Sequence, residues 1–206
     1  PCQHPQVGRR TGRGVRLGVL GGTFDPIHSG HVLLAQAVRE QLPLDRVLFV
    51  PAADPPHKDD QGASAVHRLE MVRLAIDGLD GFELCHAEHD RTGPSYTVDT
   101  LRELRRRFTD SELYLIIGAD NVAELSSWYD PEGILSLATI VSGTRVDSTD
   151  APTSGFGARI QHLSTPVYEI SSTEIRQRLS QGLPVRYLVP EAVERYAQQH
   201  NLYRGS

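Results

Sequence analysis

Short apolar runs alternate with amphipathic segments along most of the chain. The runs are rich in aliphatic and β-branched residues, as is typical of buried strands, and lie at residues 15–20, 46–50, 82–86, 113–117, 138–141 and 167–170. Apolar residues recur at helical spacing in segments near residues 32–42, 65–76, 95–108, 171–179 and 190–196. Strands that alternate with helices predict a mainly parallel sheet with helices on both faces. We therefore expect a Rossmann-like, doubly wound α/β fold.

Two of the expected helices begin at hydroxyl residues that can cap them. Ser64 precedes the segment 65–76, and Ser171 with Glu174 has the spacing of a capping box. In the first of these helices, the apolar positions expected to face the core are Val66, Leu69, Val72 and Ile76. In sheets of this kind ligands bind outside the carboxyl ends of the strands, so we expect the chemistry in the strand-end loops.

The length of 206 residues, with 39% hydrophobic and 23% charged residues, is typical of one globular domain. We expect residues 1–14 to form a disordered tail or a cloning remnant. Residues 15–206 are then a single α/β domain, with a helical C-terminal part from about residue 171. No apolar run approaches the roughly 18 residues that a membrane span needs, so we expect no membrane association.

The net charge and the cysteines limit which partners and which cellular compartment we expect. The net charge is −5, and the N-terminal tail is basic, so the rest of the chain is more acidic still. This argues against a nucleic-acid partner. Cys2 and Cys85 are expected to be free thiols, and the tail lacks the apolar segment of a secretory signal. We expect a cytoplasmic protein, and the sequence leaves its oligomeric state open.

The segment GGTFDPIHSGH at residues 21–31 lies directly between the first strand and the first helix. Its glycines allow a ligand to approach the backbone, and the following helix N-terminus offers amides and a positive dipole end, which favour phosphate. His28 and His31 can donate hydrogen bonds to phosphoryl oxygens, and the pKa of each imidazole is expected to rise beside phosphate. The spacing differs from that of a Walker loop and of a dinucleotide-binding loop.

A second candidate phosphate site lies near the C-terminus. The segment ISSTEIR at residues 170–176 places hydroxyl groups at a helix start and an arginine, Arg176, in the first turns. Helix amides, hydroxyls and one guanidinium together favour phosphate. We expect the two segments to face one triphosphate from opposite sides.

Both segments resemble the nucleotidyltransferase superfamily that carries the H-x-G-H motif. Residues 22–31 match G-x-F-D-P-x-H-x-G-H, and residues 170–176 resemble its second motif, I-S-S-T-x-x-R. Further segments resemble one family within it, nicotinate mononucleotide adenylyltransferase: PAADPPHK at 51–58, HRLEM at 67–71, PSYTVDTL at 94–101, GADN at 118–121, WY at 128–129 and LYR at 202–204. The resemblance covers essentially residues 15–204.

This resemblance implies a reaction and its partners. AMP would pass from ATP to nicotinate mononucleotide, giving nicotinate adenine dinucleotide and pyrophosphate in NAD biosynthesis. The implied cofactor is Mg²⁺, carried mainly by ATP, with no metal ligands on the chain. Catalysis of this kind is largely positioning and stabilisation of negative charge, which explains cationic donors without a protein nucleophile.

The resemblance also implies roles for individual residues. His28, His31 and Arg176 would stabilise the transition state. The implied ATP-binding residues are Gly21, Gly22, Thr23, Phe24, His28, His31, Gly118, Asp120, Ile170, Ser171, Ser172 and Arg176. The implied substrate-binding residues are Thr97, Trp128, Tyr129, His57 and Lys58.

Physical reasoning supports an acidic pyridine substrate. The segment GPSYT at residues 93–97 leads into a helix, whose free amides attract a carboxylate more strongly than an amide group. Trp128, the only tryptophan, lies in a polar stretch, where its indole can stack on a flat ring. By resemblance, Tyr129 adds a backbone amide, and His57 and Lys58 lie on a loop that closes over phosphates.

Other functions remain open at this point. A related adenylyltransferase would act on nicotinamide mononucleotide or pantetheine phosphate. A metal-dependent hydrolase would use Asp25, His28 and His31 as ligands, and a non-catalytic sensor would bind ATP without turnover. HAEHD at residues 86–90 contains metal-ligand types, but alternate residues of an extended chain point to opposite faces. The family's Arg-Pro-Gly-like step is replaced near Arg145, whose role the sequence leaves open.

Overall fold

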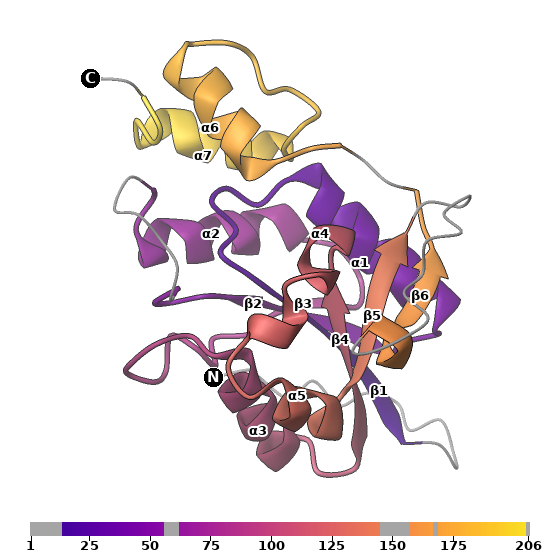
Figure 1. Cartoon of the computed structure of the whole chain (residues 1–206). Coiled ribbons are helices and arrows are strands. Elements are labelled where there is room, and N and C mark those ends of the chain that lie inside the picture. Colours follow the sequence, from indigo (N-terminus) through magenta and orange to yellow (C-terminus); the bar gives the residue numbers. More distant parts are fainter. Residues whose placement is uncertain (1–13, 56–61, 145–156, 167–168, 205–206) are drawn as a thin grey trace.

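The computed structural model describes residues 14–55, 62–144, 157–166 and 169–204. Within these ranges, six strands form a single parallel sheet in the order β3-β2-β1-β4-β5-β6 (Figure 1). The strands are β1 (Val15–Gly22), β2 (Arg46–Pro51), β3 (Phe82–Leu84), β4 (Ser111–Ile117), β5 (Thr139–Thr144) and β6 (Gln161–Ser164). The helices are α1 (Ser29–Gln41), α2 (Ala65–Ile76), α3 (Thr97–Arg107), α4 (Ala119–Val122), α5 (Pro131–Leu137), α6 (Ser172–Ser180) and α7 (Glu191–Gln199). The expected doubly wound α/β fold is confirmed.

The strand order creates a crevice at the centre of the sheet. β1 pairs with β2 on one side and with β4 on the other, so that Val19 lies opposite both Leu48 and Leu115. The chain winds outward from β1 to β3, then returns to the middle and winds the other way. The connections after β1 and β4 therefore diverge at the carboxyl edge, where such sheets bind ligands.

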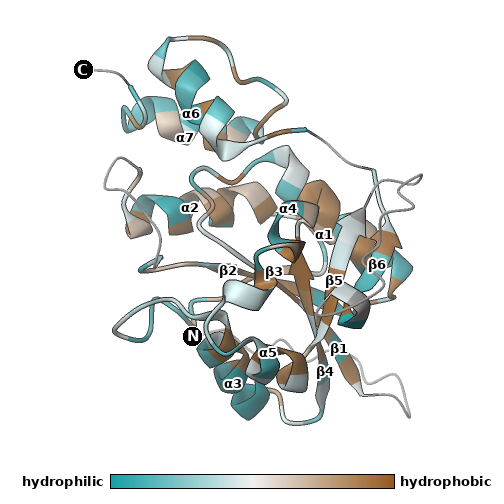
Figure 2. Cartoon of the chain, viewed as in Figure 1, coloured by the Kyte–Doolittle hydropathy of each residue, from teal (hydrophilic) through white to brown (hydrophobic). Residues whose placement is uncertain are grey.

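Helices cover both faces of the sheet, because alternate strand residues point to opposite sides. Phe49 and Ile116 belong to one buried cluster, with residues of α1, α2, α6 and α7. Leu48 and Leu115 belong to a second cluster, with residues of α3 and α5. Figure 2 shows the hydrophobic strands of the sheet between these two layers. Apolar burial on both faces explains why the central strands are continuous apolar runs.

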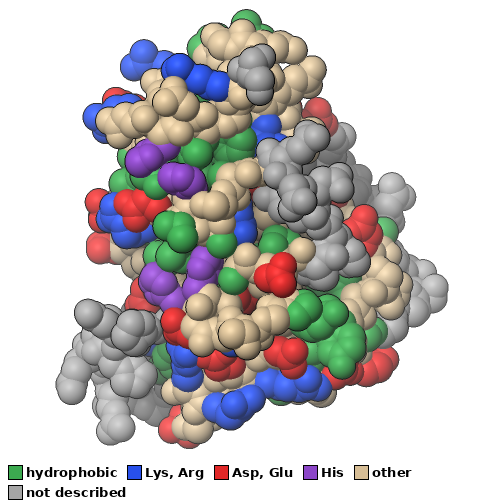
Figure 3. Space-filling view, turned by 90° about the vertical axis from the view of Figure 1, so that its left-hand side faces the viewer, with side chains coloured by type: hydrophobic (Ala, Val, Ile, Leu, Met, Phe, Trp, Pro, Cys, Tyr) green, Lys and Arg blue, Asp and Glu red, His purple; other side chains and the backbone are tan. Residues whose placement is uncertain are grey.

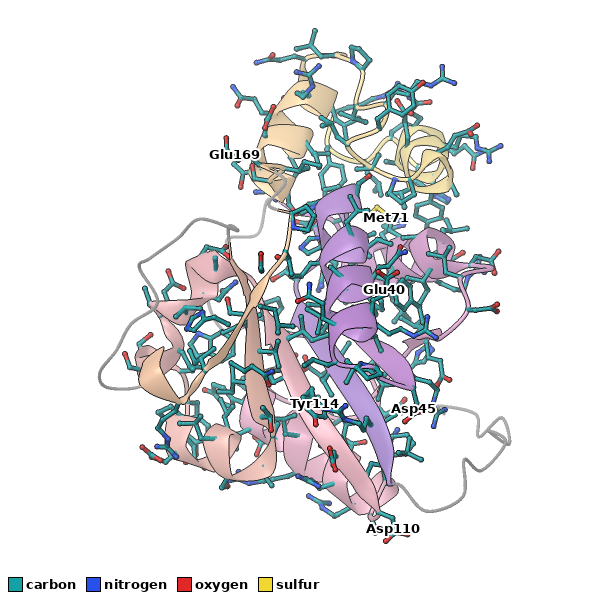
Figure 4. The ribbon with its side chains drawn as sticks, turned by 90° about the vertical axis from the view of Figure 1, so that its right-hand side faces the viewer. Glu40, Asp45, Met71, Asp110, Tyr114 and Glu169 are labelled. Atoms are coloured by element: carbon teal, nitrogen blue, oxygen red, sulfur yellow. The ribbon has the colours of Figure 1, made fainter. Side chains whose placement is uncertain are left out.

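The C-terminal helices lie beyond the carboxyl edge of the sheet, above α1 and α2 in Figure 1. Met71 of α2 points toward them in Figure 4, in the same buried cluster as Val185, Val189 and Val193. Ser29 at the start of α1 also holds this region, because its N–H donates to Leu188 O at 2.8 Å and its hydroxyl to Tyr187 O at 2.9 Å. The C-terminal segment is thereby fixed over the crevice.

Two expectations from the sequence are wrong. The last strand is Gln161–Ser164 and not residues 167–170, of which 167 and 168 lie outside the described ranges. In α2, Val66 is 71% exposed, whereas Arg68 is 2% exposed and lies on the buried side. Ser64 does cap α2, because its side chain accepts from the His67 N–H. The division into a tail and one domain stays a prediction, because residues 1–13 lie outside the described part.

No helix in the described ranges has the length and apolar character that crossing a bilayer demands. Cys85 is buried and forms no disulfide, as expected, and Cys2 lies outside the described residues.

Candidate active site

A cavity of about 990 Å³ opens at the carboxyl edge of the sheet. Its wall is formed by the connections that follow β1 and β4, the first turn of α3 and the first turn of α6. The residues implied for ATP that line it are Gly21, Gly22, Thr23, Phe24, His28, His31, Gly118, Asp120, Ile170, Ser171, Ser172 and Arg176. Thr97, Trp128 and Tyr129 line it as well, whereas His57 and Lys58 lie outside the described residues.

The two histidines of the first motif lie face to face. Their ring centroids are 3.7 Å apart with an interplanar angle of 22°, and the edge of Phe24 packs against His31. The His28 backbone N–H donates to His31 Nδ1 at 3.2 Å. Because Nδ1 accepts this bond, the ring proton of neutral His31 is on Nε2. The first turn of α1 therefore contains a histidine, His31, whose tautomer is fixed by a backbone N–H.

Burial within the chain lowers the pKa values of both histidines. Burial lowers the pKa of His28 to about 4, and the negative charge of Asp120 offsets only part of that effect. Burial, and then the charge of His28, lowers the pKa of His31 well below its usual value. These shifts come from the chain's own groups, so the rise expected beside a bound phosphate stays a prediction. A neutral imidazole still donates one hydrogen bond.

The second motif contacts the first directly. Ser171 caps α6 by accepting from the Glu174 N–H at 3.1 Å. The Ser172 hydroxyl donates to Pro26 O at 2.9 Å, and Arg176 Nη1 donates to Asp25 O at 2.7 Å. Figure 4 shows Glu169 in the segment that leads into α6. Residues about 150 positions apart thus lie together on the cavity, whereas their expected placement on opposite sides of one triphosphate stays a prediction.

Asp25 of the first motif is buried, and its carboxylate contacts three other segments of the chain. Its Oδ1 accepts from the Ala63 N–H at 3.0 Å and from the Tyr203 hydroxyl at 2.7 Å. Its Oδ2 lies 3.9 Å from Arg176 Nη1. Burial, and then the charge of Asp25, raises the pKa of Tyr203 far above its usual value, so this hydroxyl stays a donor. The carboxylate therefore joins both motifs to the C-terminal residues.

Sequence reasoning gave Arg68 no role, although it holds the cavity wall together. The Arg68 guanidinium donates to four carbonyl oxygens, those of Thr23 at 2.7 Å, Ala52 at 2.6 Å, Ala53 at 3.3 Å and Ala63 at 3.2 Å. It thereby joins the loops after β1 and β2 to the start of α2. A signal was present in the sequence, because Arg68 lies one turn before Met71 and Val72 on a stripe of apolar residues.

The residues after β4 approach the histidines from the other side of the crevice. Gly118 is the N-cap of α4, and Asn121 Nδ2 donates to Asp120 Oδ1 at 3.2 Å. A Cβ atom on Gly118 would overlap Asp120 Oδ1, so glycine allows this close turn. Asp120 is the charge that acts on His28, which places the two implied ATP-binding segments on one cavity.

The far end of the cavity is lined by aromatic residues. Tyr96, the N-cap of α3, stacks on Tyr129 with ring centroids 4.4 Å apart and an interplanar angle of 29°. Trp128 follows the short 3-10 helix Leu125–Ser127 and is partly buried. The Tyr96 side chain does not cap α3, so the first amides of this helix have no side-chain acceptor from their N-cap. This end suits a flat, anionic group.

Metal-ligand residues do not converge in the described part of the chain, where no group of three or more His, Cys, Asp or Glu side chains is arranged to hold an ion. Histidine side chains gather in two groups on one side of the molecule (Figure 3). Outside the cavity, His67 and His200 lie with ring centroids 5.1 Å apart, and His67 Nδ1 is 2.9 Å from the Tyr196 hydroxyl. Asp25, a ligand in the hydrolase alternative, is engaged by the bonds described above.

Comparison with known proteins gives the same assignment as the motifs. The cytidylyltransferase-like family matches residues 19–178. A protein of Thermus thermophilus, named as a probable nicotinate-nucleotide adenylyltransferase, is 48% identical over 190 residues, covering 92% of this chain and all of its own length. The chain belongs to the cytidylyltransferase-like family, within the nicotinate-nucleotide adenylyltransferases. The resemblance noted in the sequence is confirmed.

Other relatives of this family agree. A similarly named protein of Synechococcus sp. strain JA-3-3Ab is 43% identical over 195 residues, covering 91% of this chain and 94% of that protein. The solved nicotinic acid mononucleotide adenylyltransferase of Plasmodium falciparum, complexed with NaAD, superposes with a TM-score of 0.76. That similarity covers 92% of this chain and 97% of the other, at 18% identity, and shows a shared fold.

Proposed function

We propose that this chain transfers AMP from ATP to nicotinate mononucleotide and releases pyrophosphate. The observation that carries the proposal is that the H-x-G-H segment and the Ser-Ser-Thr segment meet on one cavity, with Arg176 bonded to Asp25 of the first motif. Relatives at 40–48% identity are named for this activity. The cavity volume of about 990 Å³ suits two nucleotides side by side.

The chemistry needs no protein nucleophile. A phosphate oxygen of the mononucleotide forms a bond to the α-phosphorus of ATP, while the bond from that phosphorus to the pyrophosphate oxygen breaks. Negative charge grows on the nonbridging and leaving oxygens. His31, through its Nε2–H, and His28 and Arg176 are the donors that we assign to these oxygens, because all three line the cavity.

Mg²⁺ belongs to the substrate in this proposal. The described residues supply no cluster of metal ligands, so the ion would arrive bound to the triphosphate of ATP. The chain's contribution is then to hold the nucleotide with amides, hydroxyls and imidazoles. Gly118 and Asp120 would face the adenosine, and Ser171 and Ser172, which line the same cavity, would face the phosphates.

Selectivity for the acid over the amide would arise at the first turn of α3. Its dipole and its uncapped amides near Thr97 favour a carboxylate. Trp128 lines the same cavity as Thr97, so its indole would contact the pyridine ring. Tyr129, His57 and Lys58 complete the proposed substrate contacts, with His57 and Lys58 placed by resemblance alone.

A pyrophosphate-release assay with ATP and Mg²⁺ tests this function, with nicotinate and nicotinamide mononucleotides compared in parallel. We expect kcat/KM to favour nicotinate mononucleotide clearly. Equal rates with both would refute the carboxylate argument. Absence of pyrophosphate from either substrate, or release of free phosphate or AMP from ATP alone, would refute the assignment and favour a sensor or a hydrolase.

A further inference from the structure

Glu88 is a buried carboxyl group on the cavity wall that the proposed reaction does not use. It lies between β3 and α3 and is 6% exposed. Its Oε1 accepts from the Thr100 hydroxyl at 2.5 Å. Burial raises the pKa of Glu88, while the hydrogen bond from the Thr100 hydroxyl and the nearby charges of Arg91 and Arg68 oppose that rise. Burial of a carboxyl group costs folding free energy unless the group is hydrogen-bonded or paired, so we consider which residues the bonds of Glu88 hold in place.

The bonds around Glu88 converge on the start of α3. Arg91 Nη2 donates to Thr100 Oγ1 at 3.0 Å and to the carbonyl oxygen of Tyr96 at 3.2 Å, and it lies 3.7 Å from Glu88 Oε1. Glu88, Arg91 and Thr100 thus contact one another beside the Tyr96 carbonyl, to which both Arg91 and Thr100 donate. Because Tyr96 is the N-cap of α3, this set fixes the direction in which the first helix amides point.

The same turn is held from two other sides. The Ser95 N–H donates to Asp54 O at 2.8 Å, and the Asp54 N–H donates back to Ser95 Oγ at 3.1 Å. The Tyr96 ring stacks on Tyr129, next to Trp128. Residues 95–97 therefore join the loop after β2 to the aromatic end of the cavity. Glu88 contacts this turn through Thr100, whose hydroxyl lies beside the Tyr96 carbonyl.

We propose that Glu88 is a positioning residue for the pyridine-nucleotide end of the cavity, acting through Thr100 and Arg91 on the first turn of α3. This inference rests on the proposed function. The hydrogen bonds of Glu88 run to the start of α3 and none reaches the two motifs, while its charge also acts on Arg68, so we expect the larger effect on the mononucleotide. A shift of the α3 amides by a fraction of an ångström is enough to weaken binding there.

The test is a comparison of KM values for the two substrates in Glu88→Ala. We expect the KM for nicotinate mononucleotide to rise about tenfold or more, while the KM for ATP stays within about twofold of wild type. Glu88→Gln keeps an oxygen acceptor for Thr100 and should restore the KM to within about threefold. Thr100→Val, which removes the hydroxyl alone, should raise the same KM and serves if Glu88→Ala fails to fold.

A matched control lies on the edge of the sheet. Glu83 pairs with Arg46 at 2.9 Å and does not line the cavity, so Glu83→Ala also breaks a carboxylate–arginine pair but should leave both KM values unchanged. If the wild-type chain releases no pyrophosphate with nicotinate mononucleotide, the proposed function falls and this inference with it. If the wild type is active and Glu88→Ala shifts neither KM, or shifts both equally, only the role of Glu88 is refuted.

Discussion

His31 carries two separable functions on its two ring nitrogens. Nδ1 accepts the His28 N–H at the start of α1, and Nε2 carries the proton that we assign to the phosphates. Substitution by an amide side chain separates them. The Gln nitrogen reaches about as far from the backbone as Nε2, whereas the Asn oxygen occupies the position of Nδ1. His31→Asn, His31→Gln and His31→Ala therefore test the helix cap and the donor independently.

The expected magnitudes differ between the two functions. Loss of one preorganised donor to developing charge raises a barrier by about 3 to 4 kcal/mol, so His31→Ala and His31→Asn should lower kcat by two to three orders of magnitude. His31→Gln restores a donor and should recover about tenfold over alanine. Loss of the cap costs about 1 kcal/mol of folding free energy, which alanine loses and asparagine retains.

Two assays read these effects. Steady-state pyrophosphate release with saturating ATP and mononucleotide gives kcat, and urea unfolding gives the free energy of unfolding for each variant. The reasoning is refuted if His31→Asn is as active as His31→Gln, because the donor would then not be at Nε2. Near-wild-type turnover of His31→Ala would remove the catalytic role altogether.

Three further predictions concern stability. Burial lowers the pKa of His28 to about 4, so between about pH 6.5 and 4 the unfolded chain binds a proton that the folded chain does not. The free energy of unfolding should therefore fall by about 3 kcal/mol from this group as the pH is lowered through that window. Urea unfolding across this window should show a weaker pH dependence in His28→Gln, and an unchanged slope would contradict the lowered pKa. Arg68→Met should cost about 3 to 5 kcal/mol, measured by the same method, because four partly buried carbonyl groups lose their donor. A cost below about 1 kcal/mol would mean that these carbonyl groups find other partners. Gly143→Ala should lower the free energy of unfolding by about 1 to 3 kcal/mol, because the new Cβ would overlap Thr165 and Leu34, and a thermal midpoint equal to wild type would show that these side chains yield freely.

The central strands were predictable because a strand covered on both faces must be apolar throughout. Ile116 and Leu115 face different helix layers, and both are buried. β6 lacks this signal, because Gln161, His162 and Ser164 are partly or fully exposed at the edge of the sheet. The sequence therefore favoured the more apolar run a few residues later. α4 is only four residues long, which is too short for any helical period to appear.

The candidate site was predictable where local composition carries the chemistry. Glycines and histidines between a strand and a helix identify a phosphate loop without knowledge of the rest of the chain. Residues whose partners are backbone atoms or distant segments give no such signal. Arg68 binds carbonyl groups, which every residue possesses, and Tyr203 reaches Asp25 across 178 positions. The inward position predicted for Val66 is wrong. The prediction ranked helix positions by side-chain hydrophobicity alone, whereas Arg68 occupies the buried side of α2 and Val66 is exposed.

The bond from Tyr203 to Asp25 has a consequence for biosynthesis. Translation proceeds from the N-terminus, so the ribosome makes the histidine loop long before the Tyr203 hydroxyl that secures it, because 178 positions separate the two residues. A nascent chain that has not yet been extended to Tyr203 therefore carries this loop without one of its side-chain supports. The loop gains the full set of bonds seen in the folded protein only after residue 203 has been added.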